Sequence, residues 1–97
     1  MTDADQLVAY RVRIEGRVQG VSFRAWTQGE ARRHQVCGWV RNRADGSVEA
    51  LIEGTRSALK VMVEALRRGP PAAKVERLDT QPANPTGAPG FTIEATL

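Results

Sequence analysis

Residues 16–24 read G-R-V-Q-G-V-S-F-R, and this segment concentrates the groups that can bind an anion. Gly16 and Gly20 leave a short, flexible backbone whose N–H groups can turn inward around an oxyanion. Arg24 follows at the start of a helix-like segment, where its guanidinium can bind the same anion through two hydrogen bonds. Loop amides, the positive end of a helix and one arginine together predict a phosphate-binding site. The predicted loop comprises Gly16, Arg17, Val18, Gln19, Gly20, Val21 and Ser22.

The sequence lacks the other common arrangements for phosphate, metal and nucleophile chemistry. It contains no G-x-G-x-x-G motif, and the two glycines lack the wider spacing and the Lys-Ser/Thr of a P-loop. His34 is the only histidine, so neither a Ser-His-Asp triad nor a histidine-based metal site is supported. Cys37 is the only cysteine, which excludes an intrachain disulfide. We therefore expect no metal and no cofactor.

The elements that must position this loop can be predicted from the pattern of apolar residues. Apolar and polar residues alternate over residues 8–15, which predicts a half-buried strand that ends at Gly16. A helix is predicted from about Ser22 to Gln35, with Ser22 as its N-cap. The apolar stripe of this helix is thin: Phe23, Trp26, Ala31 and then His34.

Four further strands and a second helix are predicted in the rest of the chain. Strands are predicted at residues 36–43 and 47–53, joined by the turn sequence Ala44-Asp45-Gly46. A helix is predicted over 55–68, capped by Thr55 and stopped by Gly69. Strands at 73–80 and 91–97 are predicted to flank a loop at 81–90 that is rich in proline and glycine.

Two helices that follow the first and third strands predict a two-layer α/β (α+β) sandwich. Its mostly antiparallel sheet of four to five strands would carry both helices on one face, in a ferredoxin-like βαββαβ order. By parity, Asn42 shares the helix-facing side of its strand with Val36 and Val40 and lies at the rim of that side. We expect one domain over residues 1–97, with residues 1–6 as a flexible tail.

Composition limits the classes of partner. The formal net charge of +3 is carried mostly by arginine and is too small to indicate nucleic acid by itself. No apolar run is long enough to span a membrane, and the first residues are acidic where a secretory signal would be basic and then apolar. We expect a reduced, cytoplasmic protein that binds neither nucleic acid nor membrane, with a monomer as the default.

Three motifs together resemble those of the acylphosphatases. They are the segment at 16–24, then G-W-V-R-N-R-A-D-G-S-V-E at 38–49, and G-P-P at 69–71. The resemblance runs from about Val8 to Val75, and the Phe91-x-Ile93 segment is also similar. It implies a small ferredoxin-like enzyme that hydrolyses acyl phosphates to a carboxylate and inorganic phosphate without metal or cofactor. It also implies that Arg24 binds the phosphate and that Asn42 orients the attacking water.

The chemistry of the substrate agrees with these implied roles. The leaving carboxylate is a weak base, with a pKa of about 4 for a carboxyl group, so its departure needs no general acid. Phosphoryl transfer of this kind relies on positioning and on electrostatic stabilisation of the phosphoryl oxygens. The carboxamide of Asn42 can hold a water molecule without adding negative charge. Because it is too weak a base to take the proton, we expect a phosphate oxygen of the substrate to accept it, and we expect phosphate or sulfate to bind as product-like ligands.

The sequence departs from the family at two places, and three different functions stay open. His34-Gln35 replace the usual aliphatic-glycine end of the first helix, and Thr92 and Glu94 replace basic residues of the last strand.

A similar domain leads larger carbamoyl-transferring hydrogenase-maturation proteins, which continue into cysteine-rich modules where this chain stops at Leu97. The chain could also bind RNA on its open sheet face, with Trp39 as the main aromatic side chain, or be an inactive structural member of the family. Arg17, Arg41 and Arg43 are expected to raise the local positive potential.

Overall fold

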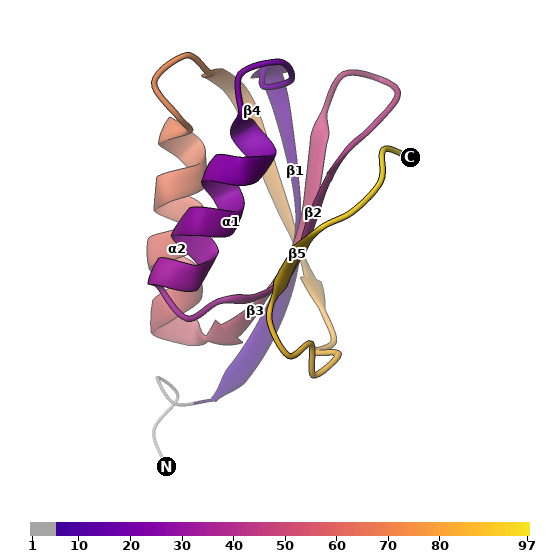
Figure 1. Cartoon of the computed structure of the whole chain (residues 1–97). Coiled ribbons are helices and arrows are strands. Elements are labelled where there is room, and N and C mark those ends of the chain that lie inside the picture. The colour runs from indigo at the N-terminus through magenta and orange to yellow at the C-terminus, as the bar shows by residue number, and fades with distance from the viewer. Residues whose placement is uncertain (1–5) are drawn as a thin grey trace.

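The computed structural model describes residues 6–97, and these residues form one five-stranded sheet with two helices packed on one face (Figure 1). The strands are β1 (Leu7–Arg17), β2 (Cys37–Asn42), β3 (Val48–Thr55), β4 (Lys74–Ala83) and β5 (Phe91–Ile93), and the helices are α1 (Phe23–Arg33) and α2 (Arg56–Arg68). The strand order is β4-β1-β3-β2-β5. Only the β2–β5 pair is parallel. This is the predicted ferredoxin-like sandwich. The predicted tail at 1–6 lies outside the described residues except for Gln6, which is exposed.

The core lies between the sheet and the helices, as the alternation in β1 predicts. Val12 and Ile14 of β1 are fully buried and lie opposite Ala50 and Val48 of β3. The helices contribute their own fully buried side chains to the same cluster: Phe23, Ala31, Leu59, Met62 and Leu66. Each large apolar side chain that is fully buried stabilises the fold by about 1.5–3 kcal/mol. One shared core therefore holds the loop between β1 and α1 against the rest of the sheet.

Both strands near the end of the chain differ in length from their predictions. β4 continues to Ala83, so the first residues of the predicted 81–90 loop belong to the strand, where Gln81 pairs with Arg11 of β1. Pro82 is tolerated because β4 is an edge strand. The final strand ends at Ile93 rather than at 97. Beyond it, only single backbone hydrogen bonds continue along β2, among them Leu97 N–H to the Asn42 carbonyl at 3.1 Å.

The rest of that loop is held by a buried carboxylate. Glu53 of β3 is 6% exposed and accepts hydrogen bonds from the backbone N–H groups of Thr86, at 2.7 Å, and Gly87, at 3.0 Å. The Thr86 hydroxyl also donates to Glu53. These bonds satisfy a buried charge that would otherwise be costly, and they hold the loop that precedes β5 against β3.

The observed boundaries agree with the prediction for α2 but not for α1. α2 begins and ends as predicted: the Thr55 hydroxyl accepts a hydrogen bond from Ala58 N–H at 3.1 Å, and Gly69 has a φ of 68°. α1 is shorter than the predicted 22–35, and the predicted capping by Ser22 is wrong. Ser22 is at the N-cap position, but its backbone is left-handed (φ 63°, ψ 26°) and its side chain makes no capping bond. Side-chain capping requires the extended conformation that Thr55 has and Ser22 lacks.

The buried side of α1 also differs from the predicted stripe. Phe23 and Ala31 are buried as expected, but Trp26 is only half-buried and Thr27 is fully buried. His34 is the C-cap residue and is half-buried, so it does not extend an apolar face. Within residues 6–97, neither helix has the length and apolar character needed to cross a membrane.

Candidate active site

The predicted loop and Asn42 lie at the same end of the molecule. The β1–α1 connection and the β2–β3 turn are both at the top of Figure 1. A hollow of about 410 Å³ opens between the β1–α1 connection, the first turn of α1 and the ends of β2 and β5. It is lined by Val18, Gln19, Gly20, Ser22, Phe23, Arg24, Ala25, Asn42 and Ile93. The structure therefore brings Arg24 and Asn42, which belong to different elements, to one surface depression.

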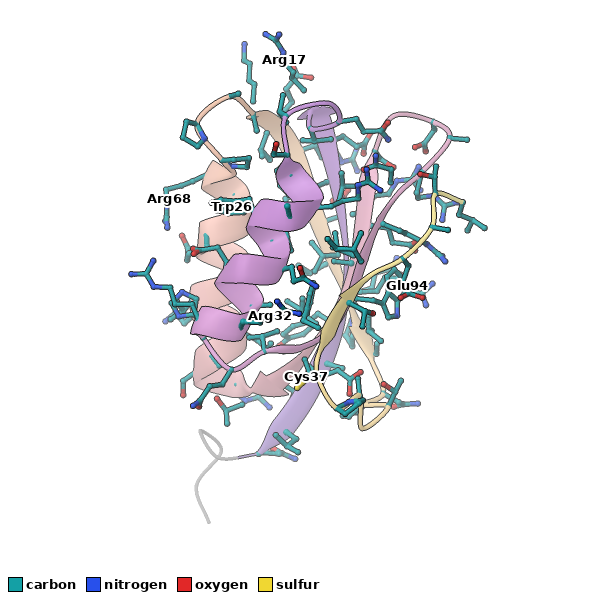
Figure 2. The ribbon with its side chains drawn as sticks, in the orientation of Figure 1. Arg17, Trp26, Arg32, Cys37, Arg68 and Glu94 are labelled. Atoms are coloured by element: carbon teal, nitrogen blue, oxygen red, sulfur yellow. The ribbon has the colours of Figure 1, made fainter. Side chains whose placement is uncertain are left out.

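Three members of the predicted loop lie outside this lining. Gly16 and Arg17 belong to β1, and Gly16 lines a separate hollow with the Asp45 turn. Gly16 has a φ of 124° at a shift in the β1–β4 register, and a Cβ there would come within 2.3 Å of the Lys74 carbonyl oxygen. Arg17 is exposed and extends outward at the loop end of the molecule (Figure 2). Val21 packs against the core cluster.

Three residues that were not predicted from the sequence also line the hollow. Phe23 and Ala25 flank Arg24 in the first turn of α1, while Ile93 comes from β5. Ile93 reaches the site because β5 pairs in parallel with β2, where it lies opposite Val40. Phe23 and Ala25 could have been predicted as site residues, because they are adjacent to Arg24 in the sequence. Nothing local in the sequence indicates Ile93.

The first turn of α1 supplies N–H donors at the hollow. The first N–H groups of a helix have no partner within the helix, and here the ladder starts with Trp26 N–H to the Ser22 carbonyl at 3.0 Å. The Ser22 side chain does not cap these groups, and the first turn contains no acidic residue. Because the positive end of the helix dipole adds to these donors, this end of α1 can bind an anion.

Arg24 brings a full positive charge to the same turn. Its side chain lines the hollow, and the residue is half-buried. Among the described residues it forms no ion pair with a carboxylate. Its guanidinium is therefore available to an anion in the hollow, for which a bidentate contact is the strongest form of binding.

Asn42 is the last residue of β2, and the following turn is tightly hydrogen-bonded. Arg43 N–H donates to the Ser47 carbonyl at 2.9 Å, and Gly46 N–H donates to the Arg43 carbonyl at 3.1 Å. The Asp45 carboxylate accepts from both the hydroxyl and the N–H of Ser47, at 2.6 Å and 2.9 Å, and these bonds lower the pKa of Asp45. Asn42 thus lies at the start of a hydrogen-bonded turn and lines the hollow.

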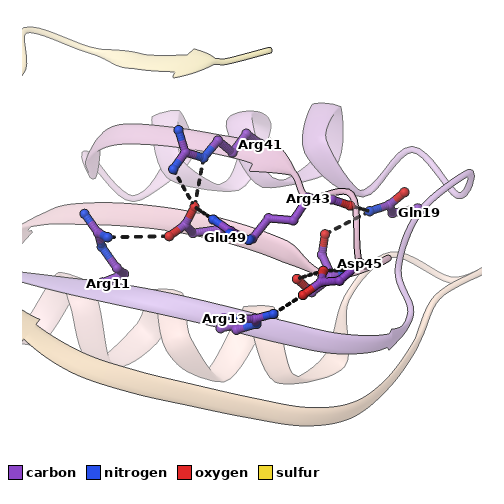
Figure 3. A network of polar contacts seen from close by, with 8 residues as sticks. Arg11, Arg13, Gln19, Arg41, Arg43, Asp45 and Glu49 are labelled. Carbon is purple, nitrogen blue, oxygen red and sulfur yellow. Dashed lines mark hydrogen bonds and ion pairs between the residues drawn. The ribbon is translucent and has the colours of Figure 1, made fainter. Parts of the chain in front are cut away.

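The arginines near Asn42 lie on the open face of the sheet, opposite the face that the helices cover (Figure 3). Arg41 and Arg43 bind the Glu49 carboxylate at 2.8 Å and 3.0 Å, and Arg11 lies 3.6 Å from it. Burial raises the pKa of Glu49, but the hydrogen bonds and charges of Arg41 and Arg43 outweigh burial and leave this pKa lowered. Arg13 pairs with Asp45. These arginines therefore neutralise carboxylates of the open sheet face.

The comparisons with known proteins agree on one family. The acylphosphatase family model matches residues 10–93. An acylphosphatase of Rhizobium etli is 59% identical over 80 residues, which are 82% of this chain and 85% of that protein. An acylphosphatase of Chloroflexus aurantiacus is 53% identical over 88 residues, which are 90% of this chain and 96% of that protein. The crystal structure of acylphosphatase from Bacillus subtilis superimposes with a TM-score of 0.88 at 42% identity, covering 92% of this chain and 99% of that one.

These matches confirm the predicted family and fold class, and with them the predicted enzyme class, a hydrolase acting on acid anhydrides. The family model spans both the first turn of α1, which carries Arg24, and the strand that carries Asn42. Identity above one half over most of the chain goes well beyond a shared fold. The chain belongs to the acylphosphatase family.

Proposed function

We propose that this acylphosphatase binds the phosphoryl group of its substrate with Arg24 and the backbone amides of the β1–α1 connection, and that Asn42 orients the attacking water. The observation that carries the proposal is the shared hollow, which holds an unpaired guanidinium, a helix N-terminus and a carboxamide. Four other hollows in the described residues each lack at least one of these three groups. The proposal covers residues 16–22 as the phosphate-binding segment, with Gly16 and Arg17 shaping its start from β1.

The reaction needs little beyond positioning. Water attacks phosphorus, the bond from phosphorus to the acyl oxygen breaks, and the carboxylate leaves without protonation because it is a weak base. Negative charge on the phosphoryl oxygens is stabilised by donors that are already in place before the reaction. The proton of the water passes to a phosphoryl oxygen. Asn42 holds the water in line, since its carboxamide offers both an acceptor and donors.

The test is hydrolysis of benzoyl phosphate in the presence of EDTA, with inorganic phosphate as inhibitor. We expect metal-independent turnover and competitive inhibition by phosphate. Arg24→Ala should lower kcat/KM at least about a hundredfold, the usual effect of removing one donor to a developing charge, and should also weaken inhibition by phosphate. Arg24→Lys should restore little, because a point charge cannot replace the planar guanidinium. Asn42→Ala should lower kcat and leave phosphate inhibition nearer to that of the wild type.

Arg32→Ala is the matched control. Arg32 is an exposed arginine in the last turn of the same helix, and Figure 2 shows it at the end of α1 away from the loop. The loss of one surface charge there should leave both kcat and phosphate inhibition unchanged. Equal activity of the wild type and of the Arg24 and Asn42 variants would contradict the assigned roles.

The same assay distinguishes acylphosphatase activity from a different function of this fold. A domain dedicated to carbamoyl phosphate would prefer that substrate to benzoyl phosphate. An RNA-binding domain would bind single-stranded RNA with a steep salt dependence and turn over no acyl phosphate. Against RNA, the open sheet face presents arginines that are paired with Glu49 and Asp45, and Arg41 covers the Trp39 ring at 4.6 Å.

We also propose that the protein acts in the cytoplasm as a monomer. Its one cysteine, Cys37, is a free thiol, as expected in a reducing compartment. Arg24 and Asn42 line the same hollow within one chain, so both proposed roles can be supplied by a single copy. Sedimentation equilibrium of the active enzyme would test the monomer, and a mass near twice 10.6 kDa would contradict it.

A further inference from the structure

We propose that the carboxamide of Gln19 is a positioning residue that fixes the distance between the phosphate-binding segment and Asn42. Gln19 Nε2 donates one hydrogen bond to the Arg43 carbonyl at 2.8 Å and another to the Ser47 carbonyl at 2.9 Å (Figure 3). A side-chain amide has two N–H donors, so both are used on the β2–β3 turn. This proposal rests on the roles proposed above for Arg24 and Asn42.

The two carbonyls belong to the part of the turn that directly follows Asn42. Each of them already accepts a backbone hydrogen bond: the Arg43 carbonyl from Gly46 and the Ser47 carbonyl from Arg43. Gln19 uses the second acceptor position of both oxygens. It therefore joins the two sides of the turn at its base, and a movement of the turn relative to the loop would break both bonds together.

The sheet does not provide this link by itself. β1, which leads into the phosphate-binding segment, and β2, which ends at Asn42, are not neighbours, because β3 lies between them. Among residues 6–97, the two bonds from Gln19 are the only side-chain hydrogen bonds that join residues 18–22 to residues 42–47. Besides the shared core, Gln19 thus supplies a direct hydrogen-bonded link between the segment proposed to bind the anion and the turn that follows Asn42.

The test variant is Gln19→Met, which keeps the length of the side chain, adds no charge and removes both donors. A misplacement of about 1 Å between reacting groups costs up to about a hundredfold, so we expect kcat to fall roughly tenfold or more. Inhibition by inorganic phosphate should change much less, because Arg24 and the helix N-terminus are untouched. Gln19→Asn keeps the amide but shortens its reach, and it should lose kcat to a similar degree. Wild-type kcat in either variant would overturn the proposal.

A double-mutant cycle separates positioning from a general loss of structure. If Gln19 acts through Asn42, the Gln19→Met/Asn42→Ala double variant should be no slower than Asn42→Ala alone. Multiplicative losses in kcat would overturn the proposal. Urea unfolding of each variant checks that the protein is folded under assay conditions. If Gln19→Met does not fold, the same cycle is run with Gln19→Asn and decides the question in the same way.

Gln28→Met is the matched control. Gln28 is also a half-buried glutamine, and its Nε2 donates to the Phe91 carbonyl at 3.0 Å, which ties α1 to β5 rather than the loop to the turn. Its effect on kcat should be small and should combine multiplicatively with that of Asn42→Ala. Full activity of Asn42→Ala would instead contradict the water-orienting role itself. Full activity of Gln19→Met beside an impaired Asn42→Ala would contradict only the positioning role.

Discussion

The N-termini of the two helices are built in opposite ways. At α2, Thr55 is extended and its hydroxyl accepts a hydrogen bond from Ala58 N–H, so part of this helix end is satisfied within the protein. At α1, Ser22 is left-handed and its side chain caps nothing. The first helix end opens into the hollow with Arg24 and Asn42, whereas the second does not.

Under the proposed function, this difference distinguishes a helix end that is capped for stability from one whose N–H groups can bind the substrate. Unsatisfied N–H groups and the positive end of the helix dipole are unfavourable for a helix on its own, and a side-chain cap is the usual remedy. At α1 an anion can provide that remedy only if no cap occupies the donors. Under the proposed function, the free energy that a side-chain cap would contribute at Ser22 comes instead from binding of the phosphoryl group.

Among the changes that test this comparison of the two helix ends, the largest effect is expected from a carboxylate placed in the first turn of α1. Ala25 is exposed and lines the hollow, so Ala25→Glu would set a negative charge beside the bound phosphoryl group. Like charges a few ångströms apart should lower kcat/KM for benzoyl phosphate about tenfold or more. The free energy of unfolding should stay constant or rise by about 0.3–1 kcal/mol, because a carboxylate favours a helix N-terminus.

Two controls belong to that experiment. Ala25→Gln has the same bulk without charge and should retain most of the activity. Ser57→Glu places the same carboxylate in the first turn of α2, where it should raise stability and leave kcat/KM unchanged. If Ala25→Glu keeps wild-type kcat/KM, the N-terminus of α1 does not bind the phosphoryl group.

A medium effect is expected from removing the two N-cap hydroxyls. Thr55→Ala loses a capping bond and should lower the free energy of unfolding by about 1 kcal/mol. Ser22→Ala loses no capping bond, so its cost should be clearly smaller. Urea denaturation measured side by side checks this, and in a domain of this size about 1 kcal/mol also corresponds to a shift in Tm of about 4–8 °C. Equal losses would show that the two ends are not built differently.

The smallest change in the free energy of unfolding is expected when each N-cap residue is replaced by glycine, and its sign should differ between the two helices. Ser22→Gly removes the strain of a left-handed backbone at a non-glycine residue, which costs about 1–2 kcal/mol. The entropy cost of ordering glycine, about 0.5–1 kcal/mol, offsets part of this gain. The free energy of unfolding should therefore stay constant or rise slightly. Thr55→Gly has no such strain to relieve and should lower it. Thermal unfolding of both variants gives the signs, and a clear loss of stability in Ser22→Gly would contradict the assigned strain.

Features that depend on neighbouring residues could be predicted from the sequence. The alternation in β1 requires one buried face, the Thr55 cap and the Gly69 stop bound α2, and the Asp45-Gly46 turn joins β2 to β3. Each of these follows from backbone and side-chain preferences within one element. The motif that ends at Arg24 leads into the first turn of α1, and parity placed Asn42 on the helix-facing side, where both residues line one hollow.

The tertiary structure alone decided which of these parts meet. Ile93 reaches the hollow through a parallel pairing, Glu53 anchors a distant loop, and Ser22 has a left-handed backbone and makes no capping bond. The bridge from Gln19 to the β2–β3 turn spans two strands that are not neighbours in the sheet. Local preferences act over a few residues, whereas contacts of this kind depend on how the whole sheet orders its strands and on the backbone that results. For this reason the sequence determined the elements and the binding chemistry, while the folded sheet set the geometry in which that chemistry takes place.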